Sequence, residues 1–356
     1  MWFEDLMGFV EEAPSQVRRQ LVLEASGPDG PASLTSRANG KTHGCGWLET
    51  PSVGDIRAEV AMVARSQGIV LGAGQRPLSL REVIGDAGLL HAEAANAGAT
   101  FQVASQFNLL EMASTAATPA DGVGIYEYDH TQGPACAIAA GAGTVFRNYY
   151  AGGDSQQPGQ DHVQIDCLDG LTASLCDAGL APEHRPEMVN GYAMFSDASL
   201  CAINRILSQP PGASPAADRS AGSVPSPRDF LRVGVHRDVE VTLFGAGHQV
   251  TQVYCSALPV AYNKAPAGDF APLASIVLEG AYEATLGTAF LSAVAGGSPL
   301  LYLTLLGGGV FGNDEGWILA AIERALAMFA GADLEVFIVS YGSPNPALQR
   351  LVNRHH

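Results

Sequence analysis

The segment Leu300-Leu-Tyr-Leu-Thr-Leu-Leu-Gly-Gly-Gly-Val-Phe-Gly-Asn313 decides how the carboxyl-terminal part of this 356-residue chain folds. Its first half is apolar over the length of a buried strand. The glycines that follow can adopt a positive φ and let the backbone approach a ligand closely. Cap-type residues come next, and apolar residues recur at helical spacing up to Phe329. The pattern predicts a strand, a glycine loop and the start of a helix.

An anion suits such a loop, because backbone N–H groups at the start of a helix have no intrahelical partner. A glycine-rich turn without a ligand is the alternative interpretation. If a ligand binds, we expect it to contact Gly307, Gly308, Gly309, Val310, Phe311, Gly312 and Asn313.

Two further segments relate this loop to a known family. The chain has a final apolar run, Leu334-Glu-Val-Phe-Ile-Val-Ser-Tyr341, and an upstream run, Ala99-Thr-Phe-Gln-Val-Ala-Ser-Gln-Phe-Asn108. The GGGVFGND loop and the final run resemble the second phosphate-binding loop and the carboxyl-terminal end of a macro domain, the ADP-ribose-binding αβα module. The upstream run resembles the family's strand that ends in an asparagine facing the distal ribose. Here Asn108 is followed by Leu-Leu-Glu-Met instead of a glycine-rich run, so the resemblance is to a divergent member.

The resemblance implies a three-layer αβα sandwich with a macro-domain-like mixed sheet. Alternating helix and strand patterns favour the same α/β class. We expect residues 1–50 to form an N-terminal extension and residues 51–356 to form the α/β domain, with a flexible insertion around 209–228. Strands ending at Asn108, Leu306 and Tyr341 should direct their carboxyl ends into one crevice.

Local patterns predict further elements. A helix should start at Pro51 with Thr50 as its N-cap. The remaining expectations are helices over 131–147, 188–207 and 273–294, a strand over 68–71, and a hairpin formed by 231–235 and 239–244.

The net charge of −17 disfavours nonspecific binding to nucleic acid or to an anionic membrane, because both would be repelled over most of the surface. A small phosphorylated ligand is compatible with this charge, since local donors would hold it. The six cysteines show no zinc-type spacing, so free thiols are the simplest interpretation. The first residues lack the basic region of a secretory signal. We therefore expect a cytoplasmic protein with no metal and no cofactor.

The densest polar cluster is Gly124-Ile-Tyr-Glu-Tyr-Asp-His-Thr-Gln-Gly-Pro134. Glu127, Asp129 and His130 offer two carboxylates and an imidazole, which suffice to position a water molecule and move a proton. By the resemblance, Asn108 would orient the ribose, and Glu127 or Asp129 would activate water to hydrolyse an ADP-ribosyl linkage. A solvated turn is the alternative.

The resemblance also suggests ligand contacts outside this cluster. Phe311 would cover the diphosphate and ribose, and Tyr341 would stack on adenine. Asp55 lies in Val-Gly-Asp-Ile, which is similar to the family's adenine-reading Gly-Asp-Ile. From its own chemistry, Arg147 would bind phosphate or carboxylate through its forked donors. Core or surface packing is the alternative for each.

Two other functions stay open at this stage. A reader would bind ADP-ribose or a related nucleotide without turnover. A cysteine-dependent hydrolase would use Cys136 near a helix start, with Gln132 as oxyanion donor and His130, His162 or His248 as base.

Overall fold

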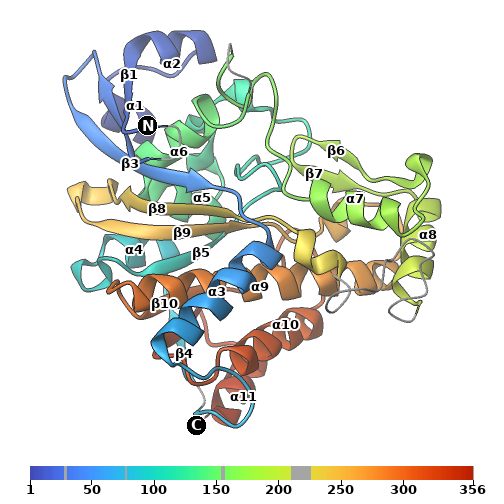
Figure 1. Cartoon of the computed structure of the whole chain (residues 1–356). Coiled ribbons are helices and arrows are strands. Elements are labelled where there is room, and N and C mark those ends of the chain that lie inside the picture. Colours follow the sequence, from blue (N-terminus) through green and yellow to red (C-terminus); the bar gives the residue numbers. More distant parts are fainter. Residues whose placement is uncertain (28–29, 77, 154–156, 210–225, 356) are drawn as a thin grey trace.

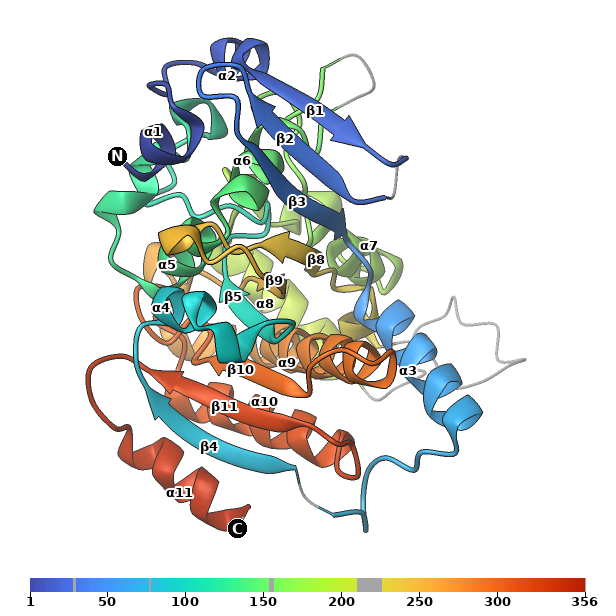
Figure 2. The same ribbon diagram turned by 90° about the vertical axis from the view of Figure 1, so that its left-hand side faces the viewer.

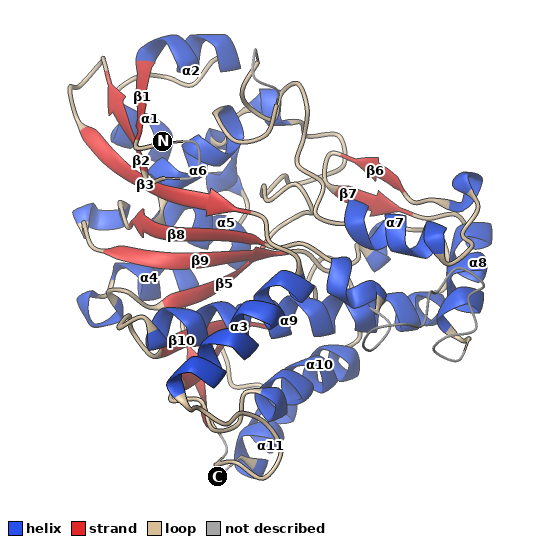
Figure 3. Ribbon diagram, in the orientation of Figure 1, coloured by secondary structure: helices blue, strands red, loops and turns tan. Residues whose placement is uncertain are grey.

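The computed structural model describes residues 1–27, 30–76, 78–153, 157–209 and 226–355. Its centre is a nine-stranded mixed sheet in the order β1-β2-β3-β8-β9-β5-β10-β11-β4 (Figures 1 and 3). The strands are β1 (Leu21–Ala25), β2 (Ala32–Ser36), β3 (Thr42–Glu49), β4 (Ser79–Ile84), β5 (Thr100–Ala104), β8 (Gly234–Glu240), β9 (Gln249–Cys255), β10 (Leu300–Thr304) and β11 (Glu335–Ser340).

The sheet has a parallel half and an antiparallel half. β9, β5, β10, β11 and β4 pair in parallel, whereas β8 joins β9 antiparallel and β3, β2 and β1 continue with alternating directions. Parallel strands end at the same edge of a sheet, and ligands of open α/β sheets bind at that edge. The segments that follow β5, β10 and β11 therefore come together.

Helices cover both faces, so the expected αβα sandwich is confirmed. α3 and α9 lie on one side of the strands, and α4, α5 and α6 lie on the other (Figure 2). α10 packs on α9, and α11 packs beside β4. These helices are α3 (Val53–Gln67), α4 (Ala87–Ala92), α5 (Gln132–Ala139), α6 (Gly141–Tyr149), α9 (Ala271–Val294), α10 (Glu315–Met328) and α11 (Pro346–Arg354).

An excursion of the chain between α6 and β8 lies beyond the carboxyl ends of the central strands (Figure 1). It carries α7 (Asp169–Asp177), the hairpin of β6 (Glu187–Val189) and β7 (Tyr192–Met194), and α8 (Asp197–Leu207). Most of the insertion expected around 209–228 lies outside the described residues.

Residues 1–50 form α1 (Trp2–Met7), α2 (Pro14–Gln20) and the first three strands. The β3–β8 pair makes these strands continuous with the main sheet. Phe3 and Met7 are fully buried in one apolar cluster with Val145 and Tyr149 of α6. The amino-terminal segment thus covers α6 and the end of the sheet.

A row of stacked rings fixes the central strands relative to one another. His91 of α4 stacks on Phe101 of β5 with ring centroids 3.7 Å apart. Phe101 stacks on Tyr302 of β10 at 4.6 Å, and Tyr302 stacks on Phe337 of β11 at 5.1 Å. Each pair of strand residues is also directly opposed in the ladder. Such cross-strand aromatic pairs stabilise the register that brings the strand ends together.

The strand, glycine loop, helix and strand predicted at the carboxyl-terminal end are confirmed as β10, α10 and β11, and the helix predicted over 273–294 is confirmed as α9. Other local predictions are wrong. Residues 68–71 form no strand, because Gly68 takes φ 67° and ends α3. The helix expected over 131–147 is broken at Ala140, which has φ −110° and ψ 57°. The helix expected from Met188 begins at Asp197, after β6 and β7. β8 pairs with β9 instead of forming a hairpin within 231–244.

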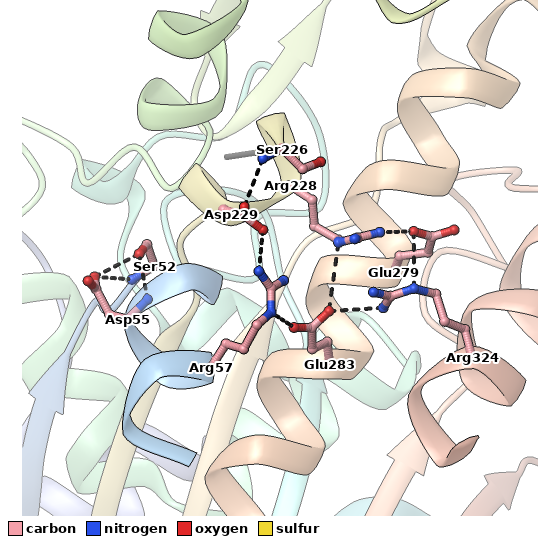
Figure 4. Close-up of polar contacts among 9 residues, drawn as sticks. All are labelled: Ser52, Asp55, Arg57, Ser226, Arg228, Asp229, Glu279, Glu283 and Arg324. Carbon is pink, nitrogen blue, oxygen red and sulfur yellow. Dashed lines mark hydrogen bonds and ion pairs between the residues drawn. The ribbon is translucent and has the colours of Figure 1, made fainter. Parts of the chain in front are cut away.

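An ion-pair network joins α3, α9, α10 and the 3₁₀ turn Pro227–Phe230 (Figure 4). Glu283 of α9 is 2% exposed and accepts from Arg57 of α3 at 2.5 Å and from Arg324 of α10 at 2.9 Å. Arg57 also donates to Asp229 at 2.6 Å, and Arg228 approaches Glu283 at 3.7 Å. Glu283 is therefore the buried carboxylate at the centre of this network, and Glu279 of α9 also contributes by pairing with Arg228 and approaching Arg324 at 3.6 Å.

Glu283→Gln should lower the free energy of unfolding by about 3 kcal/mol. This value is at the lower end of the range for breaking a buried ion pair, because the arginine partners of Glu283 keep partial contact with water. Urea denaturation followed by circular dichroism measures the change. The matched control is Glu323→Gln, whose partner Arg354 and own side chain are both half exposed; it should cost about 1 kcal/mol or less. Equal effects of the two substitutions would contradict a central role for Glu283.

Candidate active site

A cleft of about 350 Å³ opens where β5, β10 and β11 end. The loop after β5, the segment leading into α5 and the glycine loop after β10 form its walls. It is lined by Ala104, Ser105, Gln106, Glu111, Met112, Ala113, residues 129–134, Tyr192, Ala257, Tyr262, residues 304–307, residues 309–311 and Tyr341. The ends of β10 and β11 face one crevice with Leu306 and Tyr341, as predicted, whereas β5 ends at Ala104 and Asn108 does not line the cleft.

The loop after β5 turns sharply and brings Glu111 to the cleft. Leu109 has φ 64°, in the left-handed region that costs a residue with a side chain about 1 kcal/mol. The Gln106 side chain closes the loop by donating to the Met112 carbonyl at 3.0 Å and accepting from the Met112 N–H at 2.7 Å. The Glu111 N–H donates to the Tyr126 hydroxyl at 3.0 Å. Held on both sides, Glu111 has a fixed position.

The Glu111 carboxyl is buried but reaches the cleft. The residue is 5% exposed, and its Oε1 has no hydrogen-bond partner among the described residues. Burial raises the pKa of Glu111 well above its ordinary value; the charge of Arg147 lowers this pKa and that of Asp129 raises it further. The carboxyl therefore keeps its proton at a pH where an exposed glutamate has lost it. Such a group in a cleft is a candidate catalytic acid.

Gly133 allows α5 to begin directly beside this carboxyl. A Cβ at this position would lie 2.4 Å from the Ala104 carbonyl oxygen and 2.4 Å from Glu111 Oε2. Thr131, the N-cap, makes no side-chain capping bond. The N–H groups of Gln132 and Gly133 also find no acceptor among the residues that the structure describes. The start of α5 thus offers free donors and the positive end of a helix dipole to an anion.

The glycine loop presents a second set of donors. The N–H groups of Gly309, Val310 and Phe311 have no acceptor within the described part of the chain. Gly307 and Gly312, with φ of 73° and 70°, set the path of the backbone. Three consecutive free amides on a cleft wall form a nest for an anion.

Other parts of the predicted loop are used internally. Gly308, Gly312 and Asn313 do not line the cleft. The Gly308 N–H donates to Leu305 at 3.1 Å, and the Asn313 amide donates to the Leu258 carbonyl at 2.8 Å. These three residues are therefore not placed to contact a ligand in the cleft.

The start of α10 also differs from expectation. The carboxylate of Asp314 accepts from the Gly316 N–H at 2.8 Å and so occupies the end of the helix. A phosphate there would meet a carboxylate, so the prediction that free N–H groups of this helix face the ligand is wrong.

Two of the three polar residues predicted from the 124–134 cluster lie in the cleft wall. Asp129 is half-buried, and its Oδ1 accepts from the Thr131 N–H at 2.9 Å. His130 is exposed. Glu127 does not line the cleft, because its Oε2 accepts from the Trp2 N–H at 3.3 Å on the side of the amino-terminal helix. Of the two carboxylates predicted as the general base, Asp129 is therefore the one that lines the cleft.

The amino-terminal segment holds the turn that precedes Asp129. Glu11 accepts from the N–H groups of Val123 at 3.0 Å and Gly124 at 2.5 Å, and from the Tyr149 hydroxyl at 2.6 Å. This carboxylate fixes the backbone on the amino-terminal side of the cleft residues.

Three residues that were predicted to contact the ligand do not line the cleft, because their side chains are used elsewhere. Asn108 is fully buried; its amide donates to Gln164 at 2.9 Å, and its Oδ1 accepts from the Leu110 N–H at 3.1 Å. Arg147 is fully buried behind the cleft.

Asp55 lies in a capping box at the start of α3. It accepts from the Ser52 N–H at 3.0 Å and from the Ser52 hydroxyl at 2.7 Å, and the hydroxyl bond holds the pKa of Asp55 below its usual value (Figure 4). Ser52, not Thr50, is therefore the N-cap of this helix.

Aromatic side chains form the remaining wall. Phe311 packs against Tyr192 and Tyr262, with ring centroids 5.6 Å and 5.7 Å away. Tyr341, at the end of β11, is 66% exposed. It lines both the cleft and an adjoining hollow of about 610 Å³ formed with Asn345 and Arg350. The cleft thus has an apolar surface on the same side as the glycine loop.

The structure argues against a cysteine-dependent hydrolase that uses Cys136. Cys136 is 2% exposed, and burial raises the pKa of its thiol well above the ordinary value, with further contributions from Glu111 and Asp86. No described histidine hydrogen-bonds to this thiol; His248 instead contacts the His91 carbonyl at 2.8 Å. A buried, protonated thiol without a base is not a nucleophile.

Sequence reasoning missed Glu111, the buried carboxyl of the cleft. A usable signal was present, since a single carboxylate stands among the apolar residues Leu109, Leu110 and Met112 directly after a buried strand. The sequence did suggest that the start of this helix could stabilise an anion, but it gave no position for the N–H groups of Gln132 and Gly133 relative to the glycine loop. Only the packing of α5 against β5 places them opposite the glycine loop.

Among the described residues, His, Cys, Asp and Glu side chains form no group of three or more that could hold a metal ion. No helix in the described ranges is long and apolar enough to cross a membrane.

No protein-family model and no curated protein matches the sequence. Solved structures of poly(ADP-ribose) glycohydrolase align over most of the chain. The enzyme from Thermomonospora curvata aligns at 13% identity and a TM-score of 0.40, covering 96% of this chain and 97% of that one. The enzyme from Deinococcus radiodurans in complex with ADP-ribose aligns at 12% identity and a TM-score of 0.40, covering 86% and 93%.

Glu111→Gln should stabilise the protein at neutral and alkaline pH. A raised carboxyl pKa in the folded state favours folding below the pKa of the unfolded chain, and this contribution is lost as pH rises through the folded-state pKa. The gain in Tm over wild type should therefore grow with pH and vanish near pH 4. Thermal melts between pH 4 and pH 9 measure it. A gain that is independent of pH would mean that Glu111 does not titrate as a buried acid.

Proposed function

We propose that the protein binds ADP-ribose or a closely related nucleoside diphosphate sugar and hydrolyses an ADP-ribosyl linkage. The observation that carries the proposal is the buried Glu111 carboxyl beside two sets of free backbone donors in one cleft. The macro-domain resemblance of the GGGVFGND loop favours the same ligand.

The diphosphate would lie between the start of α5 and the glycine loop. Gln132 and Gly133 supply N–H groups from one wall, and Gly309, Val310 and Phe311 supply them from the other. Neutral N–H groups bind phosphate without a cationic surface, which reconciles such a ligand with a net charge of −17.

The nucleoside would extend from the glycine loop toward Tyr341. The exposed ring of this residue offers a stacking surface at the border of the cleft and the adjoining hollow. The sugar that carries the scissile bond would then lie at the opposite end, near Glu111 and Asp129.

In this reaction Glu111 would act as the general acid. Its proton passes to the leaving group as the bond to the anomeric carbon breaks, which leaves an oxocarbenium-like centre on the ribose. Asp129, nearer to solvent, would orient a water molecule; the water oxygen bonds to the anomeric carbon and its proton passes to the carboxylate. The two carboxyls suit different roles because one is buried and the other half exposed.

A reader that binds ADP-ribose without turnover is the second candidate. It needs the donors and Tyr341 but gives no reason for a buried carboxyl with an orphan oxygen, which costs stability. That cost favours the enzyme, since strained or destabilising groups collect at catalytic sites.

Gly309→Val should weaken ADP-ribose binding at least tenfold. A Cβ at this position meets nothing within 4 Å, so the added side chain enters the cleft without disturbing the core. Titration calorimetry measures the affinity. Gly268→Val is the matched control, because its Cβ also meets nothing within 4 Å and it lies outside the cleft. Unchanged binding by a folded Gly309→Val protein would exclude the glycine loop as the diphosphate site.

Glu111→Gln should lower kcat for release of ADP-ribose from a modified substrate by roughly 10²–10⁴-fold while ADP-ribose affinity stays near wild type. Asp129→Asn should also lower kcat, whereas Glu127→Gln should change it little, since Glu127 faces the amino-terminal helix. Tight ADP-ribose binding by a wild-type protein without any turnover would favour the reader. If neither occurs, the ligand class itself is wrong.

A further inference from the structure

Arg147 of α6 is among the largest fully buried side chains of the molecule. A buried guanidinium is costly unless a carboxylate or several acceptors compensate it. No described carboxylate forms an ion pair with Arg147. Its position therefore needs a reason other than a salt bridge.

Neutral groups solvate this charge. Arg147 donates through Nε to the Leu109 carbonyl at 3.2 Å, through NH2 to the Thr144 hydroxyl at 3.0 Å and through NH1 to His236 Nδ1 at 3.3 Å. The guanidinium also lies over the Tyr254 ring, 3.7 Å from its centroid. Burial, with a contribution from Arg147, lowers the pKa of His236 to about 3, so the imidazole is neutral and can accept. Neutral acceptors and an aromatic ring therefore stabilise this charge without a counter-charge paired to it.

One of these contacts reaches the strained turn before Glu111. Leu109 has φ 64°, and its carbonyl is the acceptor for Arg147 Nε. Its side chain packs against Gly234, where an added Cβ would lie 2.6 Å from Leu109 Cδ1. Strained backbone persists only where surrounding contacts determine it, and here the guanidinium supplies one of them.

We propose that Arg147 is a positioning residue for Glu111: it holds the strained turn that directs this carboxyl into the cleft and places a fixed positive charge behind it. The reaction assigned to Glu111 rests on the proposed function, but the positioning itself is measurable without substrate.

Few of the titratable groups around Glu111 carry a charge near pH 7. Four groups that face Glu111 are neutral near pH 7, because burial raises the pKa of each. They are Tyr126 from the 3₁₀ turn Gly124–Tyr128, Tyr192 from β7, Tyr254 from β9 and Cys136 from α5. Arg147 and Asp129 are the charges that remain, and they act on Glu111 in opposite directions. Two charges of opposite sign therefore act on the Glu111 carboxyl.

The test is a ¹³C NMR titration of the Glu111 carboxyl, assigned by the signal lost in Glu111→Gln. Arg147→Met should move its titration midpoint upward, because a charge that favours the ionised form is gone. Arg147→Lys keeps the charge, so the midpoint should stay near that of wild type. Lysine lacks the forked donors, so kcat should still fall roughly tenfold. Asp129→Asn should move the midpoint downward.

A purely structural role for Arg147 predicts a lower Tm in both Arg147 variants with no movement of the midpoint, and that result would overturn the proposal. Thr144→Ala provides a second test that does not depend on the folding of Arg147→Met. It removes one acceptor of the guanidinium from a small buried side chain. Amide exchange of Leu110 and Glu111 should then accelerate at least tenfold while that of β5 stays unchanged. Unchanged exchange at the turn would contradict the proposal even where the enzyme shows no ADP-ribosyl turnover.

Discussion

The parallel pairing of β5 with β10 and of β10 with β11 is the constraint on which the rest of the site depends. It forces the loop after β5, the glycine loop and Tyr341 to leave the sheet at one edge, although they lie far apart in the chain. The stacked rings of Phe101, Tyr302 and Phe337 resist a shift of register between these strands. A slip of one residue would reverse which side chains face the core and would separate the walls of the cleft.

The two buried charges Glu283 and Arg147 have different surroundings. Glu283 is compensated by arginines from α3, α10 and the turn before β8, so it stabilises the packing of helices over one face of the sheet. Arg147 is compensated only by neutral groups, and on the other face it lies behind a carboxyl whose pKa is raised. The first arrangement serves the fold. The arrangement at Arg147 leaves a charge without a paired counter-charge close to a carboxyl with a raised pKa, which is typical of a functional site.

The sequence predicted those parts of the site that are built from consecutive residues. Part of the glycine loop and Tyr341 line the cleft, because a strand end and the residues after it share one location, and Asp129 and His130 line it too. Asn108, Arg147 and Asp55 were polar residues in favourable sequence contexts, yet none of them lines the cleft, and each is satisfied by hydrogen bonds within the fold. A polar side chain within a motif does not reveal which way it points. That direction depends on turns such as the one at Leu109, where φ is positive in a residue that rarely adopts it.

By itself, the amino-acid sequence determined the α/β class, the order of the carboxyl-terminal elements and the presence of a glycine loop between a strand and a helix, because hydrophobic periodicity and glycine placement act over neighbouring residues. Only the tertiary structure decided that residues 1–50 extend the central sheet, that α5 begins against Glu111, and that Glu111 is buried next to the glycine loop. Each of these depends on contacts between residues tens to hundreds of positions apart. Burial and the field of Arg147 then set the pKa of Glu111, and neither exists until the chain has folded around that carboxyl.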